Sequence, residues 1–189
     1  MKPTIQIKDK CFEISIPSEK ILEEVKRMAE QINKDLAGTE PLFLVVLNGA
    51  FMFAADLMKQ VSIPCQISFV KLASYHGTGT TGKVKELIGL NENIEGRTVV
   101  IVEDIVDTGI TMEQMIHSLK AKHPKEVHIA TFFYKPEALQ KTVHLDYVGM
   151  HIPNDFIVGY GLDYDGFGRN LTDIYTLKKE VNEVCLSLK

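Results

Sequence analysis

The sequence predicts an α/β fold in which a doubly wound, mostly parallel sheet carries helices on both faces. Apolar runs of strand length alternate with segments whose apolar residues recur at helical spacing. Several runs are continuously apolar, as is typical of parallel strands that are buried on both faces. The 189 residues contain no repeat or linker that would divide them. We therefore expect a single domain over residues 1–189.

The first half of the chain is expected to contain two helices and two strands. A helix is predicted over 18–38, behind a serine cap and before a glycine, because its apolar residues share one face. The run PLFLVVLNG then reads as a buried strand. A second helix over 50–60 is followed by CQISFVKLAS, which alternates as a strand does.

The second half continues the alternation of strands and helices. A short extended segment around 87–90 precedes the strand GRTVVIVED, the helix TMEQMIHSLKAK and the strand EVHIATFFYK. The last segment, 178–189, is expected to be a terminal helix that packs through Val181, Val184 and Leu188. In such a sheet, ligands bind in the crevice at the carboxyl ends of the strands.

Bulk composition argues against several classes of protein. The net charge is −4, which disfavours a chain whose main task is to coat nucleic acid. Cys11, Cys65 and Cys185 are odd in number and lack metal-binding spacing, so they predict neither a disulfide framework nor a zinc site. The amino terminus lacks the apolar core of a signal peptide, and the longest apolar run is too short to cross a bilayer. We expect a cytoplasmic protein with no membrane partner.

The stretch HGTGTTGKV, residues 76–84, nearly satisfies two phosphate-binding motifs. It matches the P-loop as far as Lys83, but Val84 stands where a magnesium-binding hydroxyl is needed. It also matches G-x-G-x-x-G, yet no apolar helical stripe follows. Small, flexible residues over about 74–84 instead suit a mobile lid that excludes water, or an ordinary surface hairpin tip.

The segment VVIVEDIVDTGITM places three carboxylates at the end of a buried strand. Glu103 and Asp104 end the strand, and Asp107 follows three residues later. Such carboxylates repel one another unless a cation or sugar hydroxyls lie between them, and their oxygens suit Mg²⁺. The next residues, TGIT, supply hydroxyls and free amides at a helix start, where a phosphate can bind. Alternatively, Asp107 and Thr108 only cap that helix while the other two acids face solvent.

At this point the chain resembles the type I phosphoribosyltransferases, and in particular the hypoxanthine-guanine phosphoribosyltransferases of purine salvage. VVIVEDIVDTGITM is similar to their phosphoribosyl pyrophosphate signature. LNGAFMFAADL, the SY before the glycine-rich loop, FYKP and DFIVGYGLDYDGFGRNL appear in the family's order between residues 42 and 177. The resemblance implies a mobile loop at about 74–84 and a small hood subdomain made of the N-terminal segment and about 145–189.

The same resemblance implies the roles of individual residues at the sugar and phosphate end. Glu103 and Asp104 would hold ribose hydroxyls and Mg²⁺, with Asp163 as a further metal ligand. Asp107 would act near N7 of the base as the catalytic group. The remaining residues implied to bind this part of the substrates are Leu47, Asn48, Gly49, Ser74, Tyr75, Ile105, Thr108, Gly109, Ile110, Thr111 and Arg169. The family commonly has a small or basic residue where Asn48 stands, so this chain supplies no positive charge there.

At the base end, Lys135 ends an apolar strand before a proline. Its ammonium can donate to a 6-oxo group but cannot accept from a 6-amino group, which favours hypoxanthine or guanine over adenine. Taken alone, Lys135 would be read as a solvated surface charge, and Phe156 as a core aromatic. By resemblance, Phe156 would stack on the purine and Ile157 would offer backbone groups to the base edge.

The leading hypothesis is therefore a Mg²⁺-dependent transferase that makes IMP or GMP from phosphoribosyl pyrophosphate and a 6-oxopurine. The family implies a homo-oligomer, either a dimer or a tetramer. One alternative is a transferase for xanthine or a pyrimidine. Another is a regulator that keeps this fold to bind RNA, which the net charge of −4 disfavours.

Overall fold

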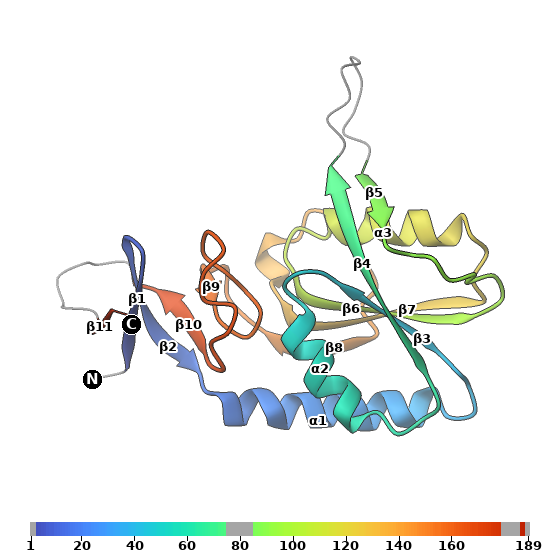
Figure 1. Ribbon diagram of the computed structural model, residues 1–189, viewed down its shortest axis with the longest axis horizontal. Helices are drawn as coiled ribbons and strands as arrows, with labels where there is room; N and C mark the ends of the chain where they lie inside the picture. Colours follow the sequence, from blue (N-terminus) through green and yellow to red (C-terminus); the bar gives the residue numbers. More distant parts are fainter. Residues whose placement is uncertain (1–2, 75–84, 179–185, 188–189) are drawn as a thin grey trace, which may run out of the picture.

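The core of the molecule is a six-stranded sheet (Figure 1). The computed structural model describes residues 3–74, 85–178 and 186–187. The strand order is β5-β4-β3-β6-β7-β8, and only β5 runs antiparallel to its neighbour. The strands span β3 Leu42–Val46, β4 Gln66–Ser74, β5 Lys85–Ile88, β6 Thr98–Val106, β7 Glu126–Tyr134 and β8 Tyr147–His151. The predicted doubly wound, mostly parallel sheet is confirmed.

Three helices cover the two faces of this sheet. α1 (Ser18–Asp35) and α2 (Phe51–Gln60) pack on one face, and α3 (Ile110–Lys120) packs on the other. Alternate residues of each strand point to opposite faces, so Phe43 and Val45 meet α1 and α2, whereas Leu44 belongs to the cluster with α3. This explains why the strands are continuously apolar. A 3₁₀ turn, η1 (Pro136–Ala138), follows β7.

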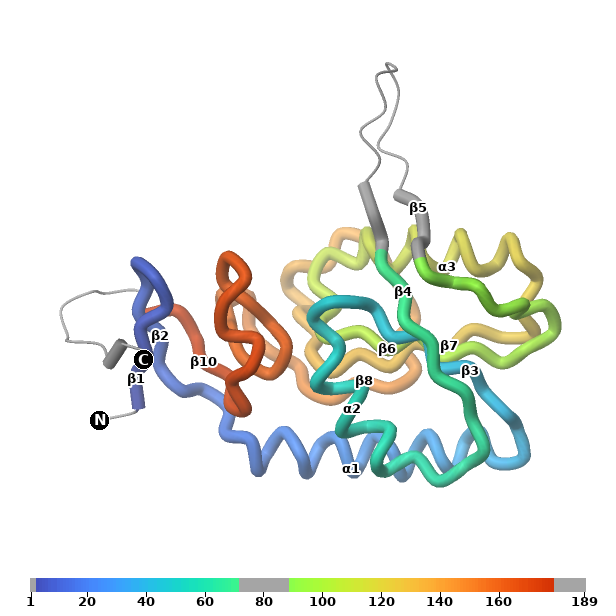
Figure 2. Tube along the Cα trace, viewed as in Figure 1, coloured from blue at the N-terminus to red at the C-terminus, as the bar shows by residue number. Residues whose placement is uncertain are grey.

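A second sheet stands beside the core and is reached through α1 (Figure 2). Its order is β11-β1-β2-β10-β9. The strands are β1 Thr4–Ile7, β2 Lys10–Ile16, β9 Ile157–Val158, β10 Ile174–Leu177 and β11 Leu186–Ser187. Phe12, Val158 and Tyr175 form its own small buried cluster with Ile7. Strands from the two ends of the chain therefore share one layer. Only the family resemblance implied such a hood, since short, mixed sequence patterns did not predict it.

Two sequence predictions about these elements need correction. The expected terminal helix is wrong at Leu186–Ser187, which form a strand parallel to β1. Ser18 does not cap α1 with its side chain. The cap position is Pro17, and the Ser18 amide instead donates to Asp173 Oδ1 at 2.7 Å. Asp173, which is 155 positions away in the chain, thus accepts from one of the otherwise unpaired amides at the start of α1. Local sequence cannot reveal such a partner.

The cysteines also differ from expectation. Cys65 is free, whereas Cys11 takes part in a disulfide. The odd number and wide spacing of the cysteines did not predict that bond. Across the described ranges, no helix is long and apolar enough to span a membrane.

Candidate active site

A crevice of about 370 Å³ opens where β3 and β6 end. The turn after β3 forms one wall, and the end of β6 with the start of α3 forms the other. Because parallel strands end at the same edge, residues far apart in the chain converge here. The lining comprises Val46, Leu47, Gly49, Glu103, Asp104, Ile105, Val106, Asp107, Thr108, Gly109, Thr111 and Met112.

Two carboxylates lie inward at the floor of this crevice. Glu103 is only 7% exposed, and its Oε1 accepts from the Asp104 amide at 3.1 Å. Asp104 Oδ1 accepts from the Ile105 amide at 2.8 Å. Burial and then the Asp104 charge hold the pKa of Glu103 well above its usual value, and burial also raises the pKa of Asp104. The prediction that these acids meet in a crevice, and do not face solvent, agrees with this geometry.

The two acids have the character of a site for a hard cation. Their donors are oxygens, and their raised pKa values mean that the charged forms lack sufficient compensation. Among the described residues, no three His, Cys, Asp or Glu side chains are grouped to hold a metal. Mg²⁺ is usually held by one or two carboxylates together with substrate phosphates and water, so this pair fits that ion without a full protein cage.

Gly49 is packed directly behind Asp104. A Cβ added at Gly49 would lie 1.5 Å from Asp104 Oδ2, so no side chain fits there. The preceding Leu47–Asn48 peptide is cis. In the described part of the chain, the amides of Asn48 and Gly49 make no hydrogen bond. These amides are therefore available to an anion, as predicted for this turn.

The loop that follows β9 packs against the turn after β3. A Cβ at Gly161 would lie 1.9 Å from the Gly49 carbonyl oxygen, so the two backbones are in contact. Arg169 Nη1 donates to the Gly161 carbonyl at 2.8 Å, and Nη2 pairs with Asp163 Oδ1 at 2.6 Å. The Arg169 charge also lowers the pKa of Asp104 against the effect of burial. Asp163 and Arg169, predicted as separate contacts, thus form one unit.

The turn after β6 has the geometry of a phosphate cradle. Gly109 has φ of +76°, in the left-handed region that favours glycine, and α3 begins at the next residue. Thr108 Oγ1 accepts from the Ile110 amide at 3.4 Å, a long hydrogen bond at the helix start. The capping alternative is therefore realised by Thr108, whereas no such bond is found for Asp107 among the described residues. In the same ranges the amides of Thr111 and Met112 make no hydrogen bond, and the Asp107 side chain is 46% exposed.

Lys135 lies between this turn and the second sheet. It is 7% exposed, and its Nζ donates to the Asp155 carbonyl at 2.8 Å and lies 4.0 Å from Asp107 Oδ2. Its amide donates to the Val106 carbonyl at 3.0 Å. The surface-charge alternative is excluded by this burial. Lys135 therefore connects the acidic turn to the segment that carries Phe156.

Phe156 presents an exposed ring beside that lysine segment. It is 47% exposed, although aromatic side chains normally lie inside. Its ring is flanked by Phe12 at 6.3 Å and by Tyr164 at 5.9 Å, measured between ring centroids. Ile157 follows in β9 and pairs with β10. The core alternative for Phe156 is thus wrong, and the exposed part of its ring can receive a flat ligand.

The remaining predicted residues are only partly visible. Ser74 ends β4, whereas Tyr75 and most of the expected lid, 75–84, lie outside the described residues. Sequence reasoning missed three contacts made by the predicted site residues: Gly161 against Gly49, the Asp155 carbonyl on Lys135, and the Tyr164 ring on Phe156. The run of glycines after β9 was a signal for the first, since close backbone approach requires glycine.

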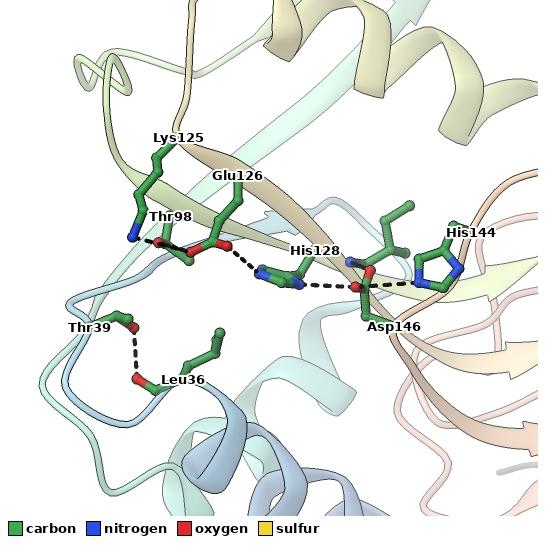
Figure 3. Close-up of polar contacts among 9 residues, drawn as sticks. Leu36, Thr39, Thr98, Lys125, Glu126, His128, His144 and Asp146 are labelled. Carbon is green, nitrogen blue, oxygen red and sulfur yellow. Dashed lines mark hydrogen bonds and ion pairs between the residues drawn. The ribbon is translucent and has the colours of Figure 1, made fainter.

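A second polar cluster lies at the opposite end of the sheet, where β6 and β7 begin (Figure 3). We call it the basal cluster. Glu126 accepts from the Thr98 hydroxyl at 2.6 Å, and its other oxygen lies 3.5 Å from His128 Nε2. Asp146 is 3.0 Å from His128 Nδ1 and accepts from the Ile129 amide at 2.8 Å. These side chains hold neighbouring strand starts together.

Comparison with known protein sequences identifies a family model and several proteins that are similar to this chain. A family model described as a phosphoribosyl transferase domain matches residues 17–165. The chain is 43% identical over 162 residues to the hypoxanthine-guanine phosphoribosyltransferase of Streptococcus pyogenes, covering 85% of this chain and 90% of that protein. It is 38% identical to that of Mycobacterium bovis over 175 residues, covering 89% of this chain and 87% of that one.

Solved structures of similar proteins superpose on most of this chain. A hypoxanthine phosphoribosyltransferase from Staphylococcus aureus superposes with a TM-score of 0.82 at 35% identity, covering 91% of this chain and 94% of that one. A hypoxanthine-guanine phosphoribosyltransferase from Bacillus anthracis superposes with a TM-score of 0.79 at 35% identity, covering 88% of this chain and 97% of that one.

Proposed function

The chain belongs to the phosphoribosyl transferase domain family, and on that premise we infer that it is a purine salvage enzyme, a hypoxanthine-guanine phosphoribosyltransferase. It transfers the phosphoribosyl group of phosphoribosyl pyrophosphate to hypoxanthine or guanine, giving IMP or GMP and pyrophosphate. The observation that carries this assignment is the inward pair Glu103 and Asp104 beside the turn at 107–111.

We propose that this pair binds the ribose end of phosphoribosyl pyrophosphate. Its oxygens can accept from the ribose hydroxyls and hold Mg²⁺, and Asp163 would be a further ligand, since each of its oxygens keeps a lone pair beyond its bond to Arg169 or Gly166. When bound, the ion would neutralise charge on the departing pyrophosphate. Arg169 and the free amides of Asn48 and Gly49 would serve the same anion.

The turn from Asp107 to Thr111 would receive the 5'-phosphate. The amides of Thr111 and Met112 make no hydrogen bond within the described residues, and the helix dipole adds a positive potential there. Asp107 is exposed to the crevice and lies beside Lys135, so its carboxylate can accept a proton from the purine as N9 attacks C1'. Ile105, Thr108, Gly109 and Ile110 would shape this part of the site.

The base would lie against Phe156 with its 6-oxo group toward Lys135. A buried ammonium with one carbonyl partner has further donors to offer, and it offers no acceptor to a 6-amino group. Flat stacking on the free face of Phe156 uses the area that the ring leaves exposed. Ile157 would add backbone contacts at the base edge.

Four broader features of the enzyme are also proposals. The whole chain would act as one domain, with the second sheet as a hood. Since β8 lies in the core sheet, the described part of that hood would comprise 4–16, 157–178 and 186–187. Residues 74–84, including Ser74 and Tyr75, would form the lid.

The protein would act in the cytoplasm as a homo-oligomer, and the exposed Ile67 and Phe69 on β4 suit self-association. Size-exclusion chromatography with light scattering would measure the subunit number.

A panel of bases in one assay tests the function. The protein is incubated with Mg²⁺, phosphoribosyl pyrophosphate and hypoxanthine, guanine, xanthine, adenine or a pyrimidine, and nucleotide is quantified by chromatography. We expect IMP and GMP, and no AMP. Turnover of xanthine or a pyrimidine alone would reassign the substrate, and absence of turnover with every 6-oxopurine would reject the enzyme class. Removal of Mg²⁺ with a chelator should abolish product formation.

A further inference from the structure

The turn between β1 and β2 grips the loop that follows β9. Tyr164 Oη donates to Asp9 Oδ1 at 2.8 Å, and Lys8 forms an ion pair with Asp165. Lys8 Nζ also lies 5.1 Å from the centre of the Phe167 ring. These contacts join the first ten residues of the chain to a loop more than 150 positions later. The two segments therefore move as one unit.

The gripped loop is a closed hairpin that carries a predicted site residue. The amide of Tyr164 donates to the Phe167 carbonyl at 2.9 Å, and the amide of Phe167 donates back at 3.0 Å. Asp163 precedes this pair, and its Oδ2 accepts from the Gly166 amide at 2.6 Å. An anchor at Tyr164 thus orients a loop that begins at Asp163.

Tyr164 also contacts the exposed aromatic ring of Phe156. The two rings meet edge to face, 5.9 Å apart and at 87°. Phe12 completes the support, at 6.3 Å from Phe156 and 6.0 Å from Tyr164. Since Phe156 is 47% exposed, the direction in which its exposed surface points depends on these two neighbours.

The bond between Tyr164 and Asp9 is directional, whereas the Lys8–Asp165 ion pair fixes no ring. Lys8, Asp165 and Asp9 are exposed at 41%, 66% and 67%, so solvent screens both contacts, and the ion pair contributes little to stability. A hydroxyl that donates to a carboxylate instead fixes the ring in one orientation. The hydrogen bond lowers the pKa of Asp9 and raises the pKa of Tyr164, so the bond persists across neutral pH.

We propose that Tyr164 and Asp9 are positioning residues that set the purine-stacking face of Phe156. This inference rests on the proposed function, because it takes Phe156 as the ring against which the base lies. Tyr164 itself does not touch the reacting atoms. Its effect is therefore on the binding of the base and not on the transfer step.

Steady-state kinetics of Tyr164→Phe tests the proposal, because this change keeps the ring and removes only the hydroxyl. We expect the KM for hypoxanthine to rise about 3- to 10-fold, the effect of one lost hydrogen bond. The kcat and the KM for phosphoribosyl pyrophosphate should stay within about 2-fold. Asp9→Asn should raise the KM for hypoxanthine similarly, and the double variant should add little to either, since both remove one interaction.

Tyr147→Phe is the matched control, because it removes a tyrosine hydroxyl at the other end of the sheet. It should leave the KM for hypoxanthine unchanged. Calorimetric binding of GMP to each variant provides a second readout and should weaken only for the Tyr164 and Asp9 variants. An unchanged KM for hypoxanthine in an active Tyr164→Phe enzyme would overturn this inference but not the proposed function. An equal rise in the KM values for hypoxanthine and for phosphoribosyl pyrophosphate, together with a lowered Tm, would do the same. An inactive wild-type enzyme would reject the proposed function itself.

Discussion

Both ends of the core sheet carry clustered acidic side chains, but their surroundings shift the pKa values of Glu103 and Glu126 in opposite directions. In the crevice, burial raises the pKa values of Glu103 and Asp104, and the Asp104 charge raises the pKa of Glu103 further. In the basal cluster, the Thr98 hydroxyl is the first cause that lowers the pKa of Glu126, and Asp146 accepts from a backbone amide. An acid whose charge is left uncompensated indicates a ligand site, whereas an acid that is met by donors indicates a structural joint.

The largest expected effect is that of Asp107→Asn, which alters the crevice without altering its fold. The amide cannot accept the purine proton, so kcat with hypoxanthine should fall about 10²- to 10³-fold. The side chain is half exposed and caps nothing, so the free energy of unfolding should change by less than about 0.5 kcal/mol. Product formation and urea denaturation measure the two quantities. Normal turnover would refute the catalytic role.

Gly49→Ala should have the next largest effect, because the new methyl group would displace Asp104. The Cβ would lie 1.5 Å from Asp104 Oδ2. A shift of about 1 Å in a positioned group can lower activity about 10²-fold, which we expect in kcat/KM for phosphoribosyl pyrophosphate. Gly96→Ala is the control, since its Cβ meets nothing within 4 Å although φ is +68°. That variant should lose stability only; equal kinetic losses in both variants would contradict the prediction.

Glu103→Gln tests the uncompensated charge through stability. The folded pKa of Glu103 is raised, so the folded state binds the extra proton and the free energy of unfolding falls as pH rises above the unfolded value of 4.5. The variant removes this loss and should be more stable than wild type at pH 8 by about 1–3 kcal/mol. At pH 4.5 the two proteins should differ far less. Urea denaturation at both pH values measures this difference in the free energy of unfolding. A wild type that is more stable than Glu103→Gln at pH 8 would refute the claim that the Glu103 charge is uncompensated.

Glu126→Gln in the basal cluster should show the smallest effect, with the opposite dependence on pH. The lowered pKa of Glu126 means that its contribution is present above the unfolded value of 4.5 and is lost as pH falls through the folded pKa. The side chain is 38% exposed, so the loss at pH 7 should be at most about 0.5 kcal/mol. Activity should not change. A large fall in kcat would show that the two ends of the sheet are coupled.

Much of the crevice could be predicted because its acids lie along one strand end. Glu103, Asp104 and Asp107 are close in sequence, and an apolar strand followed by a helix start leaves them little choice of place. The helix and strand periods of the core were also readable, since burial on both faces demands continuous apolar residues.

The second sheet was harder to predict for a physical reason. Its strands are short, and they pair residues from both ends of the chain. A two-residue strand such as Ile157–Val158 has no period to recognise. The start of α1 likewise depends on Asp173, a partner that no local pattern contains.

By itself, the sequence determined the alternating core, the acidic strand end and the glycine-bearing turn after it, because each follows from neighbouring residues and their periodicity. Only the tertiary structure decided that Gly161 touches Gly49, that Lys135 is buried beside Asp107, and that Asp9 holds Tyr164. These contacts join segments that are distant in the chain. Their formation depends on how two sheets meet in space, which no local rule specifies.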